Sequence, residues 1–167
     1  MVRDFTREMG YLPFGSRLKR VGERLQAETA RFLQQAGIDL PKGVWPLLLT
    51  LDQDGPLTIG ELAAALGVSQ PGVTRSIRQL EAAGLVEAVP DAGDRRRKPV
   101  AATEKGAEIL AATRRELWPH IEAAVRELCT SMQGSILDQL DRIEDELDRL
   151  PLDRRAAEIR DRENDDG

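Results

Sequence analysis

The clearest chemical signal in the sequence is a run of four cations: Arg95, Arg96, Arg97 and Lys98. Adjacent like charges repel one another, and the phosphates of a nucleic acid would relieve that repulsion. A flexible arginine in such a run can also enter a narrow DNA minor groove, where negative potential is concentrated. The run indicates a nucleic-acid contact, although a solvated charged loop would have the same composition.

A second set of polar side chains lies on a preceding segment with helical periodicity. At 100° per residue, Val73, Ile77 and Leu80 fall on one face, which we expect to meet a core. The opposite face suits a DNA major groove, because arginine can bond guanine bidentately and glutamine can do the same for adenine. The candidate contacts on that face and its N-terminal flank are Ser69, Gln70, Pro71, Gly72, Thr74, Arg75, Arg78 and Gln79. An ordinary amphipathic helix with a solvated face remains the alternative.

Start and stop signals around both sets predict a helix-turn-helix followed by a β-hairpin. Thr58 and Glu61 form a capping box at the start of one helix, and Ser69 is placed to cap the next. Glycines end both helices, so residues 58–83 predict a helix-turn-helix. The period then changes to that of strands, which predicts a two-stranded wing over residues 85–101, with the cations at its tip and return strand.

The flanking segments predict further helices. Residues 16–36 predict a helix capped by Ser16, and residues 44–51 are apolar nearly all round, which is typical of a buried helix. A long helix is expected to start at Thr103 and to be kinked by Pro119.

The last predicted helix spans residues 135–150 and carries a heptad seam. Its apolar residues are spaced four and three apart: Ile136, Leu140, Ile143, Leu147 and Leu150. Such a seam predicts a dimer interface, and folding back on the same protomer is the alternative. Residues 151–167 are polar and acidic, and we expect them to form a flexible tail.

Composition excludes several classes of protein. The 167 residues contain one cysteine, Cys129, and one histidine, His120, which excludes an internal disulfide framework and a multi-cysteine zinc site. Nucleophile-elbow, zinc-protease and phosphate-loop motifs are missing, so we expect no enzyme, no metal and no cofactor. The longest apolar run, Val44–Leu51, is too short to cross a membrane, and the first residues lack the apolar core of a secretion signal, so we expect a cytoplasmic protein.

Together these segments resemble the MarR family of transcriptional regulators. The resemblance rests on LTIGELAAALGVSQPGVTRSIRQLEAAGLVE (57–87) and GDRRRKPVAATEKG (93–106), and it spans roughly residues 12–150. It implies a mainly α winged-helix fold with about six helices, a two-stranded β-wing and a homodimer intertwined through its N- and C-terminal helices. It also implies that Asp94 orients Arg96 by a salt bridge while Arg96 reaches into the minor groove.

The resemblance gives the chain an expected organisation. Residues 12–36 and 103–150 would be dimerisation helices, and residues 37–102 would be the DNA-binding lobe. We expect a repressor that binds a pseudo-palindromic double-stranded DNA operator as a homodimer and is released by a small aromatic or phenolic ligand. Possible pocket residues, which core or interface packing would also explain, are Phe32, Trp45, Trp118 and His120. A winged-helix module that binds another protein without specific DNA binding is the alternative.

Overall fold

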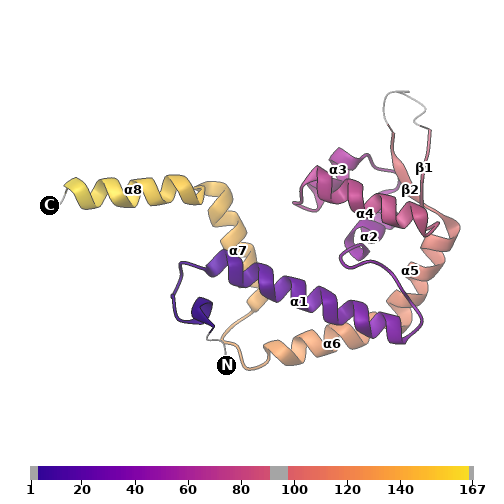
Figure 1. Cartoon of the computed structure of the whole chain (residues 1–167), viewed down its shortest axis with the longest axis horizontal. Helices are drawn as coiled ribbons and strands as arrows, with labels where there is room; N and C mark the ends of the chain where they lie inside the picture. The colour runs from indigo at the N-terminus through magenta and orange to yellow at the C-terminus, as the bar shows by residue number, and fades with distance from the viewer. Residues whose placement is uncertain (1–3, 91–97, 166–167) are drawn as a thin grey trace. The chain divides into compact units, whose positions relative to one another are not determined.

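A computed structural model describes residues 4–90 and 98–165 of the chain, which divides into two compact units, residues 1–121 and residues 122–167. These described residues form eight α-helices and a two-stranded sheet (Figure 1). The elements are a 3₁₀ helix (Phe5–Arg7), α1 (Phe14–Gln35), α2 (Trp45–Asp54), α3 (Ile59–Ala65), α4 (Gln70–Ala82), β1 (Val86–Ala88), β2 (Val100–Ala102), α5 (Glu104–Glu116), α6 (Trp118–Cys129), α7 (Ile136–Arg149) and α8 (Leu152–Asp165). No helix in this described part has the length and apolar character of a membrane span.

The helix count exceeds the expected six partly because the long helix predicted from residue 103 is two helices. α5 ends at Glu116 and α6 begins at Trp118. Pro119 has no backbone N–H, so inside one continuous helix it would remove the bond to the carbonyl of Arg115. The first N–H groups of a helix have no partner within that helix, so a proline at the second position of α6 removes no hydrogen bond. The chain therefore ends one helix before Leu117 and starts another after it, instead of forming one kinked helix.

α1 begins three residues earlier than the Ser16 cap predicts. Pro13 occupies the N-cap position, and the backbone N–H of Phe14 donates to the carbonyl of Tyr11 at 3.0 Å. The end of the helix is as predicted, because Gly37 follows with a φ of 84°, a conformation that glycine adopts without strain.

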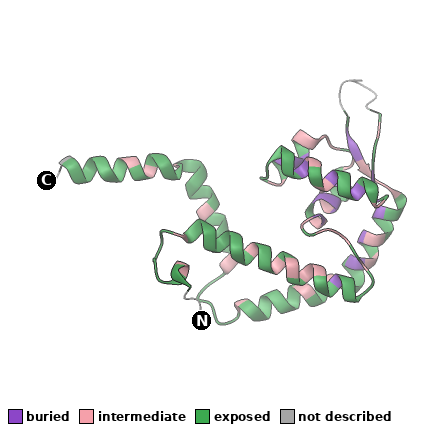
Figure 2. Cartoon of the chain, in the orientation of Figure 1, coloured by how far each residue is buried: buried purple, intermediate pink, exposed green. Residues whose placement is uncertain are grey.

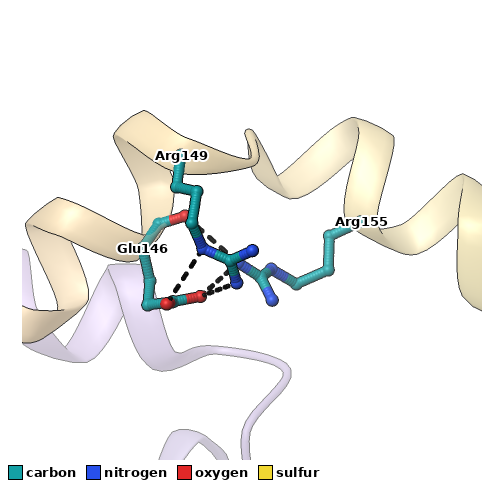
Figure 3. A network of polar contacts seen from close by, with 3 residues as sticks. All are labelled: Glu146, Arg149 and Arg155. Atoms are coloured by element: carbon teal, nitrogen blue, oxygen red, sulfur yellow. Dashed lines mark hydrogen bonds and ion pairs between the residues drawn. The ribbon is translucent and has the colours of Figure 1, made fainter.

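We expected residues 151–167 to form a flexible tail, whereas the structure forms the helix α8 over Leu152–Asp165. Arg155 donates to the carbonyl oxygen of Glu146 at 3.1 Å and to its carboxylate at 2.8 Å, and Arg149 donates to the same carboxylate at 2.6 Å (Figure 3). These bonds join the first turn of α8 to the last turn of α7 across Pro151. The prediction considered only apolar burial, and it did not include these bonds, which attach the start of α8 to α7.

The hydrophobic core lies in the unit formed by residues 1–121. It is built from α2, α3, α4, α5 and both strands, whose buried positions appear purple in Figure 2. Its members are Val44, Leu47, Leu48, Leu51, Leu62, Ala63, Val73, Ile77, Leu80, Leu85, Val86, Val100 and Leu110. The fully described helices α6 and α7 contain no buried residue, so their apolar side chains remain partly open in the single chain.

The strands are shorter than the sequence predicted, and β2 pairs with a further segment as well as with β1. β1 and β2 pair in antiparallel fashion, with Val86 opposite Ala102. Leu57 adds a bridge on the other side of β2, since it exchanges two backbone hydrogen bonds with Val100 at 3.0 and 2.8 Å. Pro99 is buried just before β2, and its carbonyl accepts from the N–H of Val89 at 2.9 Å. The proline therefore takes part in the ladder through its oxygen, and the return strand begins only after it.

Candidate nucleic-acid interface

The helix-turn-helix begins at the capping box that the sequence predicted. The backbone N–H of Thr58 donates to the Glu61 carboxylate at 2.8 Å, and the backbone N–H of Glu61 donates to the Thr58 hydroxyl at 3.3 Å. α3 packs against α4, and Gly67 between them has a φ of 62°. The turn therefore depends on a backbone conformation that favours glycine, and it fixes where α4 starts.

α4 has the two faces that its periodicity predicts. Val73, Ile77 and Leu80 are 2%, 3% and 0% exposed, so they belong to the core. Thr74 is half-buried, and its hydroxyl donates to the carbonyl of Gln70 at 2.9 Å. The other candidate contacts are all exposed: Ser69, Gln70, Pro71, Gly72, Arg75, Arg78 and Gln79. The helix thus presents two guanidinium groups and two amides to solvent from a rigidly packed base.

The backbone at the N-terminus of α4 can be approached closely by another molecule. Ser69 occupies the N-cap position in an extended conformation, but its side chain makes no capping hydrogen bond. Gly72 lies one turn in, and a Cβ there would be 3.3 Å from the Ser69 hydroxyl oxygen. Gly72 adds no side chain to the first turn, and backbone N–H groups at the start of a helix can meet an anion.

Only part of the predicted wing can be placed. Asp94, Arg95, Arg96 and Arg97 lie outside the described residues, and so does the proposed pairing of Asp94 with Arg96. Lys98 is described and is exposed, two residues before the start of β2. The base of the wing is well defined, because β1 begins four residues after α4 ends and packs against it.

Two of the four candidate ligand-pocket residues lie together. The rings of Trp45 and Trp118 meet edge to face, with centroids 6.1 Å apart and planes at 85°. Sequence reasoning missed their two polar neighbours: the guanidinium carbon of Arg114 lies 5.7 Å from the Trp118 ring centroid, and Arg114 Nη2 lies 3.1 Å from a carboxylate oxygen of Asp52. The spacing of Arg114 and Trp118, four residues apart on helical segments, was the available signal.

The other two candidate pocket residues are exposed. Phe32 on α1 is 37% exposed, and His120 is exposed near the start of α6. The Nδ1 atom of His120 lies 3.0 Å from the backbone carbonyl of Glu116. Both residues therefore lie on surfaces of unit 1 rather than in its hydrophobic core.

The second unit contains a cavity that the sequence did not indicate. Its volume is about 650 Å³, and it lies between the C-terminal half of α6 and the start of α7. Its lining includes Val125, Cys129, Met132, Ile136 and Leu137. Among the described residues, no cluster of three or more His, Cys, Asp or Glu side chains is arranged to hold a metal ion.

The predicted dimer seam is a half-open apolar stripe on α7. Leu140 and Leu147 are 36% and 44% exposed, and Ile136, Ile143 and Leu150 are half-buried. The stripe is continuous along α7, with Ser135 capping the helix by accepting from the N–H of Asp138 at 3.2 Å.

Part of the chain is similar in sequence to known proteins. Residues 37–97 match the family model described as "MarR family". The transcriptional repressor NicR of Pseudomonas putida is 34% identical over 108 residues, which cover 64% of this chain and 63% of NicR, so the chain spans less than two thirds of that relative.

Solved structures show the same fold. A cysteine mutant of MarR from E. coli, complexed with operator DNA, superimposes with a TM-score of 0.65 at 20% identity, covering 87% of this chain and 99% of that one. A MarR family transcriptional regulator from Silicibacter pomeroyi superimposes with a TM-score of 0.60 at 25% identity, covering 87% of this chain and 95% of that one.

Proposed function

We propose that this chain is a transcription regulator of the MarR family that binds double-stranded DNA in a sequence-specific manner, and the family model, NicR and the fold of the MarR–operator complex support the proposal. The observation that carries the proposal is the two-sided character of α4. Its apolar side is buried in the core, while Arg75, Arg78 and Gln79 project into solvent from the other side. A rigid helix with that exposed face is suited to reading base edges in a major groove.

The exposed face divides into base-reading and phosphate-binding groups. Arg75, Arg78 and Gln79 can each form paired hydrogen bonds with a purine edge. Ser69 and Gly72 leave the helix N-terminus accessible, so its backbone N–H groups can hold a phosphate. Base contacts would select the sequence, and phosphate contacts would fix the register of the helix on the duplex.

The wing would extend the contact into the neighbouring minor groove. The family resemblance supports Arg96, oriented by Asp94, as the inserted group. Arg95, Arg97 and Lys98 would then neutralise phosphates on either side. The exposed position of Lys98 at the wing base is compatible with this arrangement.

The proposed assembly is a homodimer formed through the N- and C-terminal helices. The apolar stripe of α7 supports it, as do the exposed apolar residues of α1, which include Phe14, Leu18 and Val21 at 40%, 40% and 54% exposure. The charges of the two helices are complementary, because α1 carries five basic and two acidic side chains and α7 carries two basic and six acidic ones. The two DNA-binding lobes of the dimer would then bind half-sites whose centres lie about 34–36 Å apart, or a multiple of that distance.

We further propose a repressor relieved by a small aromatic or phenolic ligand. The name of NicR supports the repressor assignment. The Trp45–Trp118 pair with its adjacent Arg114 supports the ligand class, because aromatic edges and a cation suit an aromatic ring with a polar substituent.

The test is a selection of bound duplexes from a random DNA pool at two salt concentrations. The proposal expects a pseudo-palindromic consensus and affinity that falls steeply with salt, as counterions are released from neutralised phosphates. The matched control is the double variant Arg75→Ala/Arg78→Ala, which keeps the buried side of α4 and should lose the consensus. Absence of any enriched sequence at low salt would support the alternative, a module that binds another protein.

A further inference from the structure

The first turn of α5 is fastened to three successive backbone carbonyls at the end of α4. The ammonium group of Lys105 donates to the carbonyl of Ala83 at 2.8 Å. The hydroxyl of Thr103 donates to the carbonyl of Gly84 at 2.8 Å. The backbone N–H of Thr103 donates to the carbonyl of Leu85 at 3.0 Å. Carbonyls at the end of a helix lack partners within the helix, so these bonds satisfy groups that would otherwise require water.

Gly106 brings the two backbones into direct contact at this junction. A Cβ at Gly106 would lie 2.1 Å from the carbonyl oxygen of Leu85, a distance that no side chain can occupy. The N–H of Gly106 donates to the Thr103 hydroxyl at 3.1 Å, so one hydroxyl caps α5 and also bonds the preceding turn. Glycine is required here for close approach.

The three carbonyls belong to the segment that connects α4 to the wing. They form the link, residues 83–85, between the end of α4 and the start of β1 at Val86. The direction of this link sets the angle between α4 and the wing base. α5 is itself anchored, because Leu110 is 1% exposed in the core.

We propose that this junction is a strut that holds α4 and the wing at a fixed relative angle, which makes Thr103 and Lys105 positioning residues for DNA binding. The inference rests on the proposed function, since it requires that α4 and the wing grip the same duplex. Two contacting elements bind one duplex tightly only when both are held at the correct spacing. If the link between them were loose, binding would have to order it, and the entropy cost would lower the affinity.

The test compares Lys105→Met with Lys105→Arg. Methionine keeps much of the stem and loses the donor, whereas arginine can still donate to the Ala83 carbonyl. We expect operator affinity to fall about three- to tenfold for Lys105→Met and to recover for Lys105→Arg. The matched control is Lys42→Met, which removes the charge of an exposed lysine before α2.

The salt dependence separates a strut from a direct phosphate contact. If Lys105 neutralised a phosphate, the slope of log affinity against log salt would fall by about 0.9 in Lys105→Met. A strut leaves that slope unchanged. Wild-type affinity in Lys105→Met, or a slope reduced by about that amount, would overturn the proposal.

Hydrogen exchange of the DNA-free protein supplies a second measurement. In Lys105→Met and Thr103→Val, the amides of the last turn of α4 and of β1 should exchange faster than in the wild type, whereas those of α3 should not. Thr103→Ser retains the hydroxyl and should restore the wild-type rates. Unchanged exchange in both variants would overturn the strut. A wild-type protein that selects no DNA would instead refute the proposed function, so the two failures are distinguishable.

Discussion

At the scale of single residues, the exposed arginines of α4 have the same chemistry but need not have the same role. Arg75 lies one turn after the open N-terminus, and Arg78 lies nearly one turn further on. A guanidinium that forms two bonds with a guanine edge carries sequence information, whereas one that meets a phosphate carries none. The distinction can be measured by substituting each residue separately.

We expect Arg75→Ala to relax base discrimination at one position of each half-site by about 1–3 kcal/mol. The reason is that a bidentate contact favours one base pair over the other three. The measurement is the affinity of the variant for an operator and for its single-base substitutions. Arg115→Ala on α5 is the control, since it removes an exposed arginine outside the candidate interface. A uniform loss of affinity over all the duplexes would show that Arg75 binds a phosphate instead.

Gly106 allows a second prediction at this scale. We expect Gly106→Ala to lower the free energy of unfolding by about 1–3 kcal/mol, because the added methyl forces the backbone of α5 away from Leu85. Gly22→Ala in α1 is the control: a Cβ there meets nothing within 4 Å, and alanine favours a helix. Denaturant unfolding measures both variants. If Gly106→Ala and the wild type had the same free energy of unfolding, the backbones at this junction could move apart without loss of stability.

At the scale of elements, the corner between α7 and α8 places two arginines on one carboxylate. Hydrogen bonds from Arg149, and secondly from Arg155, lower the pKa of Glu146 from its ordinary value of 4.5 to about 2 (Figure 3). A lowered pKa means that the folded state favours the ionised carboxylate. The corner is therefore fully stabilised above pH 4.5, and it loses this stabilisation as the pH falls to about 2.

We expect Glu146→Gln to loosen the attachment of α8 to α7. The amide side chain carries no charge, so both arginines lose their ionic partner. At pH 6 the amides in the first turns of α8 should exchange faster than in the wild type, while those of α4 keep their rates. Glu144→Gln, a change of the same kind on an exposed residue of α7, is the control. If the two variants behave alike, general charge reduction explains the effect and the corner has no special role.

The elements also show which parts of the fold the sequence could predict. The helix-turn-helix was predictable because Thr58, Gly67 and the spacing of Val73 and Ile77 act locally, within one or two turns. The bridge of Leu57 to Val100 and the close approach at Gly106 were not predictable, because they join residues distant in the chain. The predicted contact residues on α4 follow from its periodicity alone, but their role depends on a DNA duplex that the sequence does not specify.

At the scale of the whole molecule, charge and apolar surface are distributed unequally. The formal net charge is −5, although the sequence contains a run of four cations at residues 95–98. The acidic residues concentrate in the C-terminal helices, and α7 carries six of them beside its apolar stripe. An acidic surface repels DNA, so these helices are better suited to protein contact than to the duplex.

The last prediction concerns assembly. We expect Leu147→Asp to convert a dimer into a monomer, because a carboxylate in the α7 seam would be desolvated without a partner. Operator affinity should then fall by about 10²–10⁴, since each lobe would bind its half-site without the effective concentration that the second lobe provides. Light scattering coupled to size-exclusion chromatography measures the mass, and titration of the selected operator measures the affinity.

The matched control is Leu137→Asp, the same substitution on the same helix at a residue that is 68% exposed and lies off the seam. It should leave the mass and the affinity unchanged. If Leu147→Asp stays dimeric, the seam does not form the interface. If Leu147→Asp becomes monomeric but keeps its affinity, each lobe recognises its site alone and the pseudo-palindromic operator is not required. Because mass and affinity are measured separately, one variant tests two things independently: whether the seam forms the dimer interface, and whether tight binding requires both half-sites.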